Sequence, residues 1–356
     1  DEIMRPIWGD DYSICCCVSA TQTGKEMQFF GARANLAKCL LYAINGGKDE
    51  LEKGKDGKPM QVAPEFAPIT SEYLDYNEVM KKFGTMMDWL AHLYVNTLNM
   101  IHYMHDKYYY EACQMALIDT HVRRSFATGI AGFSHCVDSL SAIKYAKVTP
   151  IKDERGIIVD FKIDGEFPKY GNDDDYVDDI AIEVANHFYK EIHQYKDIFG
   201  SPFLTAFMGI SNYIPMGRVL GATPCGRKNG EPSSEGVSPY VGTDKSTPLA
   251  AMRSTAKVNQ EIHSGGTLLN LRLDHNLVAT KRGQSNLGSM IQTLFSLGAF
   301  HVQFNCISSE VLRAAQAKPE DYKDLLVRVA GYSTQFVNLS KSMQDAIIAR
   351  TEHGGF

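Results

Sequence analysis

The stretch YSICCCVS, residues 12–19, contains three consecutive cysteines, Cys15, Cys16 and Cys17. Adjacent residues place their Cα atoms about 3.8 Å apart across a trans peptide, which is shorter than the usual span of a disulfide. Zinc sites normally space their cysteine ligands by two or more residues so that the ligands can converge. The run therefore suits the transfer of sulfur chemistry between neighbouring side chains. Its structural alternative is three small buried hydrophobic residues.

The composition is typical of a soluble globular protein. The chain has 356 residues, of which 44% are hydrophobic and 22% are charged. Its formal net charge of −6 gives no reason to expect nucleic acid or a membrane as a partner, and its apolar runs are shorter than a membrane span. Apart from the triplet, the cysteines are scattered singly, as expected in a reducing cytoplasm. Because the chain starts without Met, inside a predicted loop, we expect it to be a fragment of a longer protein.

Hydrophobic periodicity predicts strands that alternate with helices, which is typical of an α/β protein. The predicted helices cover residues 27–45, 73–118, 176–195 and 340–350, and residues 125–146 are predicted as a loop followed by a helix. The predicted strands cover residues 157–163, 202–214, 267–273 and 300–307.

A second segment with possible chemistry is RVAGYS, residues 328–333. A glycine such as Gly331 usually permits only an unusual backbone angle. A glycine Cα, however, can also flatten into a radical that the flanking amide nitrogen and carbonyl stabilise. Such a radical can be exchanged with a cysteine thiol. Gly331 and the cysteine triplet can therefore be interpreted as two parts of one radical mechanism.

These two segments resemble the glycyl radical enzyme family. Residues 12–19, together with GKEMQFFGARANLAK at 24–38, resemble the active-cysteine segment of the pyruvate formate-lyase branch, and RVAGY at 328–332 resembles the glycyl radical motif. Residues 101–108, 138–145 and 301–305 also resemble family segments. The resemblance covers essentially the whole chain, but it corresponds only to the C-terminal half of the family.

The resemblance implies part of a ten-stranded α/β barrel, built from two five-stranded parallel halves, in which the cysteine and glycine loops meet. Residues 1–220 would form the C-terminal part of the lyase barrel domain with the cysteine loop, and residues 221–356 would form the glycine radical domain. A half barrel leaves sheet edges and apolar surface uncovered. We therefore expect these residues not to fold stably alone.

The resemblance also implies catalytic roles for three residues. Gly331 would hold a stored radical, installed by a separate radical-SAM activating enzyme. Cys17 would exchange a hydrogen atom with this radical, and the neighbouring Cys16 would attack the keto carbon of the substrate and carry the acetyl group. Coenzyme A would then take the acetyl group, giving acetyl-CoA and formate. Cys15 is an additional cysteine, and we interpret it as a buried spectator.

Two further residues match substrate-binding positions of the lyases. Arg33 would bind the substrate carboxylate through its guanidinium fork, with a surface salt bridge as the structural alternative. Phe30 would pack on the small substrate, with core packing as the alternative. His301, Gln303 and Asn305 alternate onto one face of a predicted strand, where they are expected to hold loops together by hydrogen bonds.

No metal is expected, since the scattered His102, His105 and His121 lack the spacing of metal ligands. The other expected partners are a small 2-keto acid and coenzyme A. Members of this family are usually homodimers, and a glycyl radical implies anaerobic fermentation.

Three functions remain open at this stage. A 2-keto-acid formate-lyase, acting on pyruvate or on a longer acid such as 2-oxobutyrate, is favoured because dehydratase-type members read Gly-Cys-Val-Glu where this chain reads Cys16-Cys17-Val18-Ser19. A diol or glycerol dehydratase-type lyase is the second, since the segments at 223–232, 264–270 and 301–305 look closer to that branch, and Cys225 replaces the usual Asp. The third is a non-catalytic partner chain that carries a glycyl radical.

Overall fold

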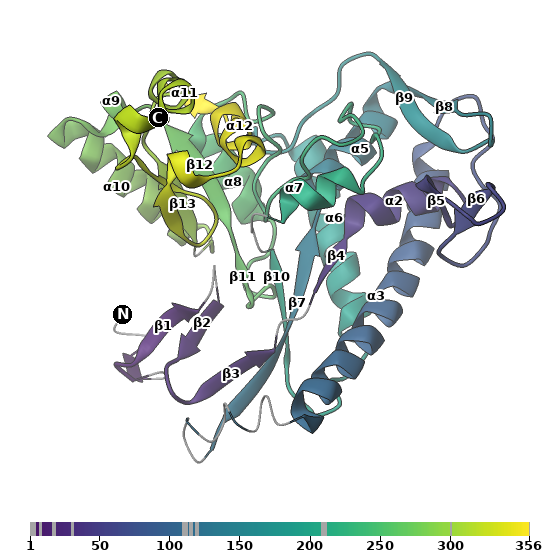
Figure 1. Ribbon diagram of the computed structural model, residues 1–356, viewed down its shortest axis with the longest axis horizontal. Helices are drawn as coiled ribbons and strands as arrows, with labels where there is room; N and C mark the ends of the chain where they lie inside the picture. Colours follow the sequence, from purple (N-terminus) through teal and green to yellow (C-terminus); the bar gives the residue numbers. More distant parts are fainter. Residues whose placement is uncertain are drawn as a thin grey trace.

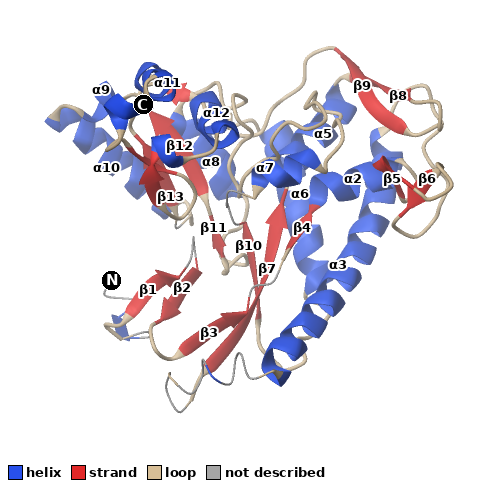
Figure 2. Cartoon of the chain, viewed as in Figure 1, coloured by secondary structure: helices blue, strands red, loops and turns tan. Residues whose placement is uncertain are grey.

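The computed structural model describes residues 5–6, 9–15, 19–29, 32–108, 113, 117, 121–207, 212–299 and 301–355. Its central sheet has the strand order β11-β10-β7-β3, with β4 also paired to β7, and every pair in it is parallel. These strands run through the middle of the molecule (Figure 2). They are β3 (Glu26–Phe29), β4 (Arg33–Asn35), β7 (Arg123–Ala131), β10 (Phe203–Phe207) and β11 (Gly266–Thr267).

A layer of helices lies on one side of this sheet (Figure 1). It consists of α2 (Leu36–Ile44), α3 (Tyr76–Lys107), α5 (Phe133–Tyr145) and α6 (Asp175–Ile192). Side-chain caps fix where two of them begin. Asn35 accepts a hydrogen bond from the Lys38 amide at 3.2 Å before α2, and Asp75 accepts one from the Glu78 amide at 2.8 Å before α3.

The sharp turn from β7 into α5 depends on Gly132. Its φ of 70° lies in the left-handed region, and a Cβ added there would lie 2.5 Å from Oδ1 of Asn35. The following helix is buried from Phe133 to Ile143. Glycine therefore lets the central strand pass directly into a helix at the centre of the core.

A second parallel sheet, in the order β13-β12-β16, lies on the other side of the molecule. Its strands are β12 (Leu269–Leu273), β13 (Val302–Asn305) and β16 (Glu352–His353). The helices around it are α8 (Pro248–Lys257), α9 (His275–Val278), α10 (Lys281–Ser296), α11 (Ser309–Ala317) and α12 (Lys341–Ala349). A second, smaller hydrophobic cluster, which includes Leu312, Phe336 and Ile347, packs in this region.

Among the described residues, four antiparallel hairpins lie outside the two sheets. They pair β1 (Tyr12–Cys15) with β2 (Ser19–Gln22), β5 (Lys48–Lys53) with β6 (Pro59–Gln61), β8 (Lys147–Lys152) with β9 (Ile158–Asp164), and β14 (Leu326–Arg328) with β15 (Ser333–Gln335). Shorter elements in the described part of the chain include α7 (Tyr213–Arg218) and the 3₁₀ turns η1 (Pro319–Tyr322) and η2 (Phe336–Asn338).

The α/β prediction is confirmed, but three local predictions are wrong. The strand predicted at 202–214 includes β10, but its last two residues begin helix α7. Residues 27–45 are not one helix, because β3 and β4 precede α2. Residues 125–131 are not a loop, because they belong to β7, the strand that pairs with β3, β4 and β10. Phe126–Ala131 is fully buried. A strand that is buried on both faces lacks the polar alternation by which half-buried strands are recognised.

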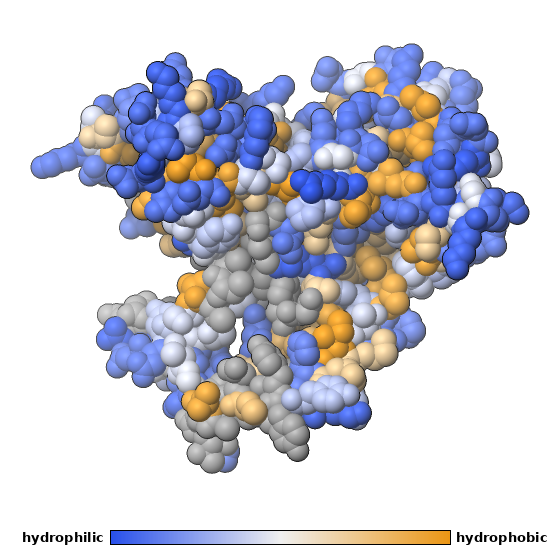
Figure 3. Space-filling view, viewed as in Figure 1, coloured by the Kyte–Doolittle hydropathy of each residue, from blue (hydrophilic) through white to orange (hydrophobic). Residues whose placement is uncertain are grey.

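Large apolar side chains remain exposed along α3. Met100 is 62% exposed and Tyr103 is 51% exposed, and Leu93, Met104 and Tyr108 are also exposed. Apolar surface is visible over this part of the molecule in Figure 3. Contiguous patches of this kind mark surfaces that bind another segment or chain. Among the helices that the structure describes, none has the length and hydrophobicity needed to span a membrane.

Candidate active site

The cysteine triplet falls at the β1–β2 hairpin. The two strands are antiparallel, with Cys15 opposite Ser19. Cys16 and Cys17, the two predicted catalytic cysteines, lie outside the described residues, and so does the predicted substrate contact Phe30. The structure therefore describes the strands on both sides of the cysteine pair.

Ser19 connects this hairpin to the central sheet. Its side chain is 1% exposed, and its hydroxyl donates a hydrogen bond to the carbonyl oxygen of Gly265 at 2.7 Å. Gly265 is itself held by β10, since its amide donates to the carbonyl oxygen of Thr205 at 3.0 Å. A Cβ on Gly265 would come within 2.5 Å of the Leu204 carbonyl oxygen, so the backbone is closely packed here. The hydroxyl of Ser19, the residue that follows Val18, therefore has a structural role, because it binds the hairpin to the backbone beside the central sheet.

Arg33 lies on β4, where it pairs with Gly129 of β7. Its side chain is partly buried, near the phenol of Tyr94. The Tyr94 hydroxyl donates to the carbonyl oxygen of Ala32 at 2.5 Å and accepts the Gly129 amide at 2.8 Å. Burial raises the pKa of Tyr94, so the phenol stays protonated. Tyr94 therefore holds the backbone carbonyl before Arg33 and the residue paired with Arg33 on β7.

Gly331 occupies the turn of the β14–β15 hairpin. Its φ of 77° lies in the left-handed region. The turn is closed by a hydrogen bond from the Val329 amide to the Tyr332 carbonyl oxygen at 2.9 Å. Val329 and Ala330 are fully buried, whereas Gly331 is partly exposed in this chain. One side of the glycine turn is thus packed and the other is open.

Two side chains of β13 hold this glycine turn. Asn305 makes a two-way contact with Arg328, since it accepts the Arg328 amide at 2.8 Å and donates to the Arg328 carbonyl oxygen at 2.7 Å. Oε1 of Gln303 accepts the Gly331 amide and Nε of Arg328, each at 3.2 Å. The predicted role of Gln303 and Asn305 in holding loops by hydrogen bonds agrees with these contacts.

A largely buried ion pair lies behind the same turn. Nη2 of Arg350 is 2.6 Å from the Glu235 carboxylate and 3.2 Å from the Val329 carbonyl oxygen. The other Glu235 oxygen accepts a hydrogen bond from Asn270 at 2.9 Å. Burial raises the pKa of Glu235, and the charge of Arg350 opposes this shift. Sequence inspection missed this pair because its partners are 115 residues apart and carry no motif.

The cysteine hairpin and the glycine turn are joined through neighbouring elements. Ser19 binds the residue before β11, and β12 follows β11 after a single residue. Gln303 of β13 lies opposite Asn270 of β12. The two predicted radical segments are therefore connected by the Ser19 hydrogen bond, by the chain from β11 to β12, and by the pairing of β12 with β13.

Cys225 lies in a partly buried turn. Its thiol is 3.2 Å from the Thr223 hydroxyl, and burial raises its pKa. Backbone hydrogen bonds from Thr223 to Arg227 and from Gly226 to Thr223 close the turn. An aspartate is therefore not required to close it.

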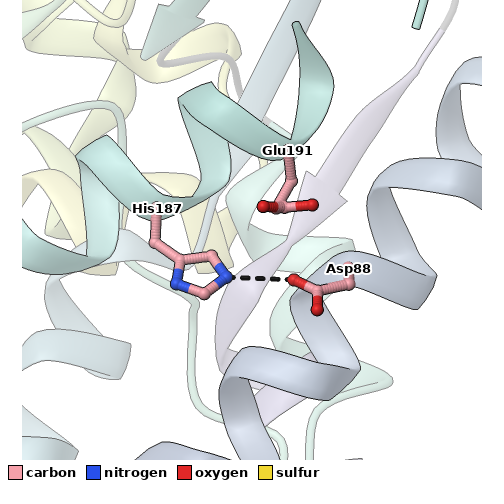
Figure 4. Close-up of side chains that lie close together, drawn as sticks. All are labelled: Asp88, His187 and Glu191. Atoms are coloured by element: carbon pink, nitrogen blue, oxygen red, sulfur yellow. Dashed lines mark hydrogen bonds and ion pairs between the residues drawn. The ribbon is translucent and has the colours of Figure 1, made fainter. Parts of the chain in front are cut away.

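His102, His105 and His121, which were not expected to bind a metal, belong to no cluster of potential metal ligands among the described residues. Buried His102 lies 3.1 Å from Asp197 and stacks on Phe29 with a centroid distance of 4.3 Å. In the part of the chain that the structure describes, one cluster brings three potential ligand atoms within 4.8 Å of one another, with Asp88 on α3 facing His187 and Glu191 on α6 (Figure 4).

Hydrogen bonds account for this cluster. His187 Nε2 is 3.0 Å from Asp88 Oδ1, and Gln194 donates to Glu191 at 2.7 Å. The Asp88 side chain is 53% exposed. We interpret the cluster as a solvated contact between two helices and assign no ion to it.

Two family models match the chain. The model described as "Pyruvate formate lyase-like" matches residues 1–217, and the model described as "Glycine radical" matches residues 233–337. The chain is 43% identical over 362 aligned residues to formate acetyltransferase 1 of Escherichia coli (strain K12), an alignment that covers 99% of this chain and 46% of the relative. The chain thus spans about half the length of this curated relative.

Solved structures also match the fold of nearly the whole chain. The glycerol-bound B12-independent glycerol dehydratase from Clostridium butyricum has a TM-score of 0.79 at 31% identity, with 98% of this chain and 46% of that chain covered. Hydroxyproline dehydratase from Clostridioides difficile has a TM-score of 0.80 at 30% identity, with 95% and 45% covered. The parallel sheet is therefore a half barrel, corresponding to about half of each of these chains.

Proposed function

Because this chain belongs to the pyruvate formate lyase-like family of glycyl radical enzymes, we propose that it carries the radical and cysteine machinery of a 2-keto-acid formate-lyase. The proposed reaction converts pyruvate and coenzyme A to acetyl-CoA and formate. Since the chain spans about half of its curated relative, the activity is proposed for the protein that carries this sequence, and a further segment would supply the rest of the barrel.

The observation that carries this choice of reaction is Ser19. Dehydratase-type members place at this position a glutamate that moves protons during the elimination of water. Here the side chain is a buried hydroxyl that is hydrogen-bonded to the Gly265 carbonyl oxygen at 2.7 Å. A hydroxyl in this environment does not titrate near neutral pH and cannot replace a carboxylate. The 43% identity to a formate acetyltransferase points in the same direction.

Each site residue has a proposed role. Gly331 stores the radical that a radical-SAM activating enzyme installs, and the radical supplies the unpaired electron for homolytic chemistry at sulfur. Cys17 exchanges a hydrogen atom with Gly331. The resulting Cys17 thiyl radical takes a hydrogen atom from Cys16, and the Cys16 thiyl radical bonds to the keto carbon. The carbon–carbon bond of pyruvate then breaks homolytically, which leaves an acetyl thioester on Cys16 and a carboxyl radical anion. This fragment takes a hydrogen atom from the Cys17 thiol and leaves as formate, which returns the radical to Cys17. The thiol of coenzyme A then takes the acetyl group and leaves its proton on the Cys16 sulfur.

Substrate binding is proposed for Arg33 and Phe30. The guanidinium of Arg33 pairs with the carboxylate of the keto acid, and the Phe30 ring packs on its small alkyl group. We also propose that residues 1–220 belong to the barrel domain and residues 221–356 to the radical domain. The enzyme would act as a cytoplasmic homodimer in anaerobic fermentation, with the uncovered apolar face of α3 available for a partner surface.

A dehydratase-type lyase is the second candidate. It is favoured by the fold match to the propanediol-dehydrating enzyme of Roseburia inulinivorans, with a TM-score of 0.82 at 29% identity, covering 97% of this chain and 47% of that chain. Residues 16–19 differ from this branch at two positions. The chain has a second cysteine, Cys16, where the dehydratases have glycine, and it has Ser19 where they have glutamate.

The deciding experiment activates the protein anaerobically and confirms the glycyl radical signal in the same tube. It then measures formate and acetyl-CoA from pyruvate or 2-oxobutyrate, and dehydration of glycerol and 1,2-propanediol. Equal amounts of formate and acyl-CoA would support the lyase. Aldehyde from a diol without formate would support the dehydratase. A radical-loaded protein inactive on every substrate would point to the non-catalytic partner chain.

A further inference from the structure

Gln303 contacts Gly331 directly. Its side chain is 6% exposed, and Oε1 accepts both the Gly331 amide and the Nε of Arg328, each at 3.2 Å. The neighbouring Asn305 holds Arg328 by both its amide and its carbonyl group. Asn305 therefore sets the position of the strand, and Gln303 supplies the side-chain acceptor for the glycine itself.

His301 explains why the Gln303 carboxamide points this way. Its Nε2 lies 3.3 Å from Nε2 of Gln303, so one of these two nitrogens must accept the hydrogen bond. A carboxamide NH₂ group only donates, whereas a neutral imidazole nitrogen accepts. Burial and the nearby charge of Arg328 lower the pKa of His301, which keeps the ring neutral. His301 thus directs the NH₂ of Gln303 to one side and Oε1 toward Gly331.

The peptide unit that Gln303 holds is the one that would share the unpaired electron. A radical on a glycine Cα is stabilised by donation from the amide nitrogen on one side and by delocalisation into the carbonyl on the other. An acceptor on the N–H polarises this amide, and the effect is larger in a partly buried site. The same contact limits rotation of the amide relative to the Cα.

We propose that Gln303, oriented by His301, is a positioning residue that holds the Gly331 amide and prolongs the life of the radical stored there. The inference rests on the proposed function, because it requires Gly331 to be the radical site. It assigns to β13 a role beyond packing.

Three variants separate this role from a structural one. Gln303→Met removes the acceptor and keeps a side chain of similar length. Gln303→Glu keeps an acceptor oxygen for Gly331 and for Arg328. Gln335→Met makes the same change at an exposed glutamine of β15, whose side-chain oxygen accepts a hydrogen bond from Asn338 at 3.0 Å.

The first measurement is amide hydrogen exchange in the resting protein, on peptides that contain residue 331. One lost hydrogen bond corresponds to roughly a threefold to tenfold change in opening. We expect exchange at Gly331 to be faster by about this factor in Gln303→Met, and unchanged in Gln303→Glu and Gln335→Met. Unchanged exchange in Gln303→Met would overturn the contact.

The second measurement is electron paramagnetic resonance after anaerobic activation. In Gln303→Met we expect altered nitrogen and amide-proton couplings and a radical lifetime shortened on the order of threefold or more, with Gln303→Glu close to the unmodified protein. Identical couplings and lifetimes in all variants would refute the positioning role. If the unmodified protein forms no glycyl radical, the proposed function fails instead, and the exchange measurement still decides the resting contact.

Discussion

Arg350 donates a hydrogen bond to the carbonyl oxygen of Val329 at 3.2 Å, two residues before the glycine of the β14–β15 turn. The same guanidinium nitrogen is paired with Glu235 at 2.6 Å, from a loop far away in the sequence. The side chains of Arg350 and Glu235 are only 8% and 9% exposed. The position of the glycine turn therefore depends on a buried charge pair from outside its own hairpin.

Glu235→Gln should destabilise the protein strongly. It leaves the charge of Arg350 buried without a counterion, a change that typically costs about 3 kcal/mol or more. Denaturant unfolding measures the loss. The control is Asp345→Asn, which removes the exposed partner of Lys341 and should cost less than about 1 kcal/mol. Equal stabilities for the two variants would contradict a structural role for the buried pair.

Ser19→Ala should loosen the cysteine hairpin. The Gly265 carbonyl oxygen loses its 2.7 Å hydrogen bond in a buried site, which costs about 1–3 kcal/mol. We expect lower stability and slower formate release than in Ser13→Ala, which alters an exposed serine of the same hairpin. Hydrogen exchange over residues 12–22 provides the structural readout. A Ser19→Ala protein with unchanged exchange and unchanged turnover would show that the hydrogen bond is dispensable.

The parallel α/β fold could be predicted from sequence because its long helices have clear periodicity and because two motifs resemble one family. The central strand, β7, could not be predicted from sequence. Residues 126–131 are buried on every side, so nothing polar marks one of their faces. The helix predicted at 27–45 failed for a related reason, because the apolar residues of β3 fit a helical spacing as well as a strand.

The candidate site could be predicted where its residues lie on a single helix or strand and follow the periodicity of that element. Gln303 and Asn305 are two residues apart on β13, and this alternation correctly predicted that they hold a loop. The Glu235–Arg350 pair was not predictable, because its partners meet only through the tertiary fold. The roles of Cys16, Cys17 and Phe30 stay predictions, since these residues lie outside the described part of the chain.

Arg33→Lys should weaken the binding of keto acid more than it slows turnover. A lysine keeps the positive charge but loses the bidentate fork that matches a carboxylate. We expect KM for pyruvate to rise on the order of tenfold, and Arg33→Gln to have a larger effect. Arg123→Lys is the matched control, because Arg123 pairs with Glu26 at 3.1 Å and is 55% exposed. An unchanged KM in Arg33→Lys would remove Arg33 from the substrate site.

Asp138 should make stability depend on pH. Its carboxyl lies in the buried part of helix α5, and burial raises its pKa from 3.8 to about 7, although it accepts the Tyr170 amide at 2.8 Å. Between these values the folded protein holds a proton on Asp138 that the unfolded chain has lost. The free energy of unfolding contributed by this group therefore falls as pH rises from about 4 to about 7.

Asp138→Asn tests this dependence, because an amide keeps the acceptor for Tyr170 without the ionisation. We expect the variant to match the unmodified protein near pH 4 and to be more stable at pH 8, on the order of a few kcal/mol. Asp345→Asn, at an exposed carboxylate, should not show this gain. Parallel stability curves for Asp138→Asn and the unmodified protein over this range would mean that Asp138 is ionised in the fold and stabilised by contacts other than the Tyr170 amide.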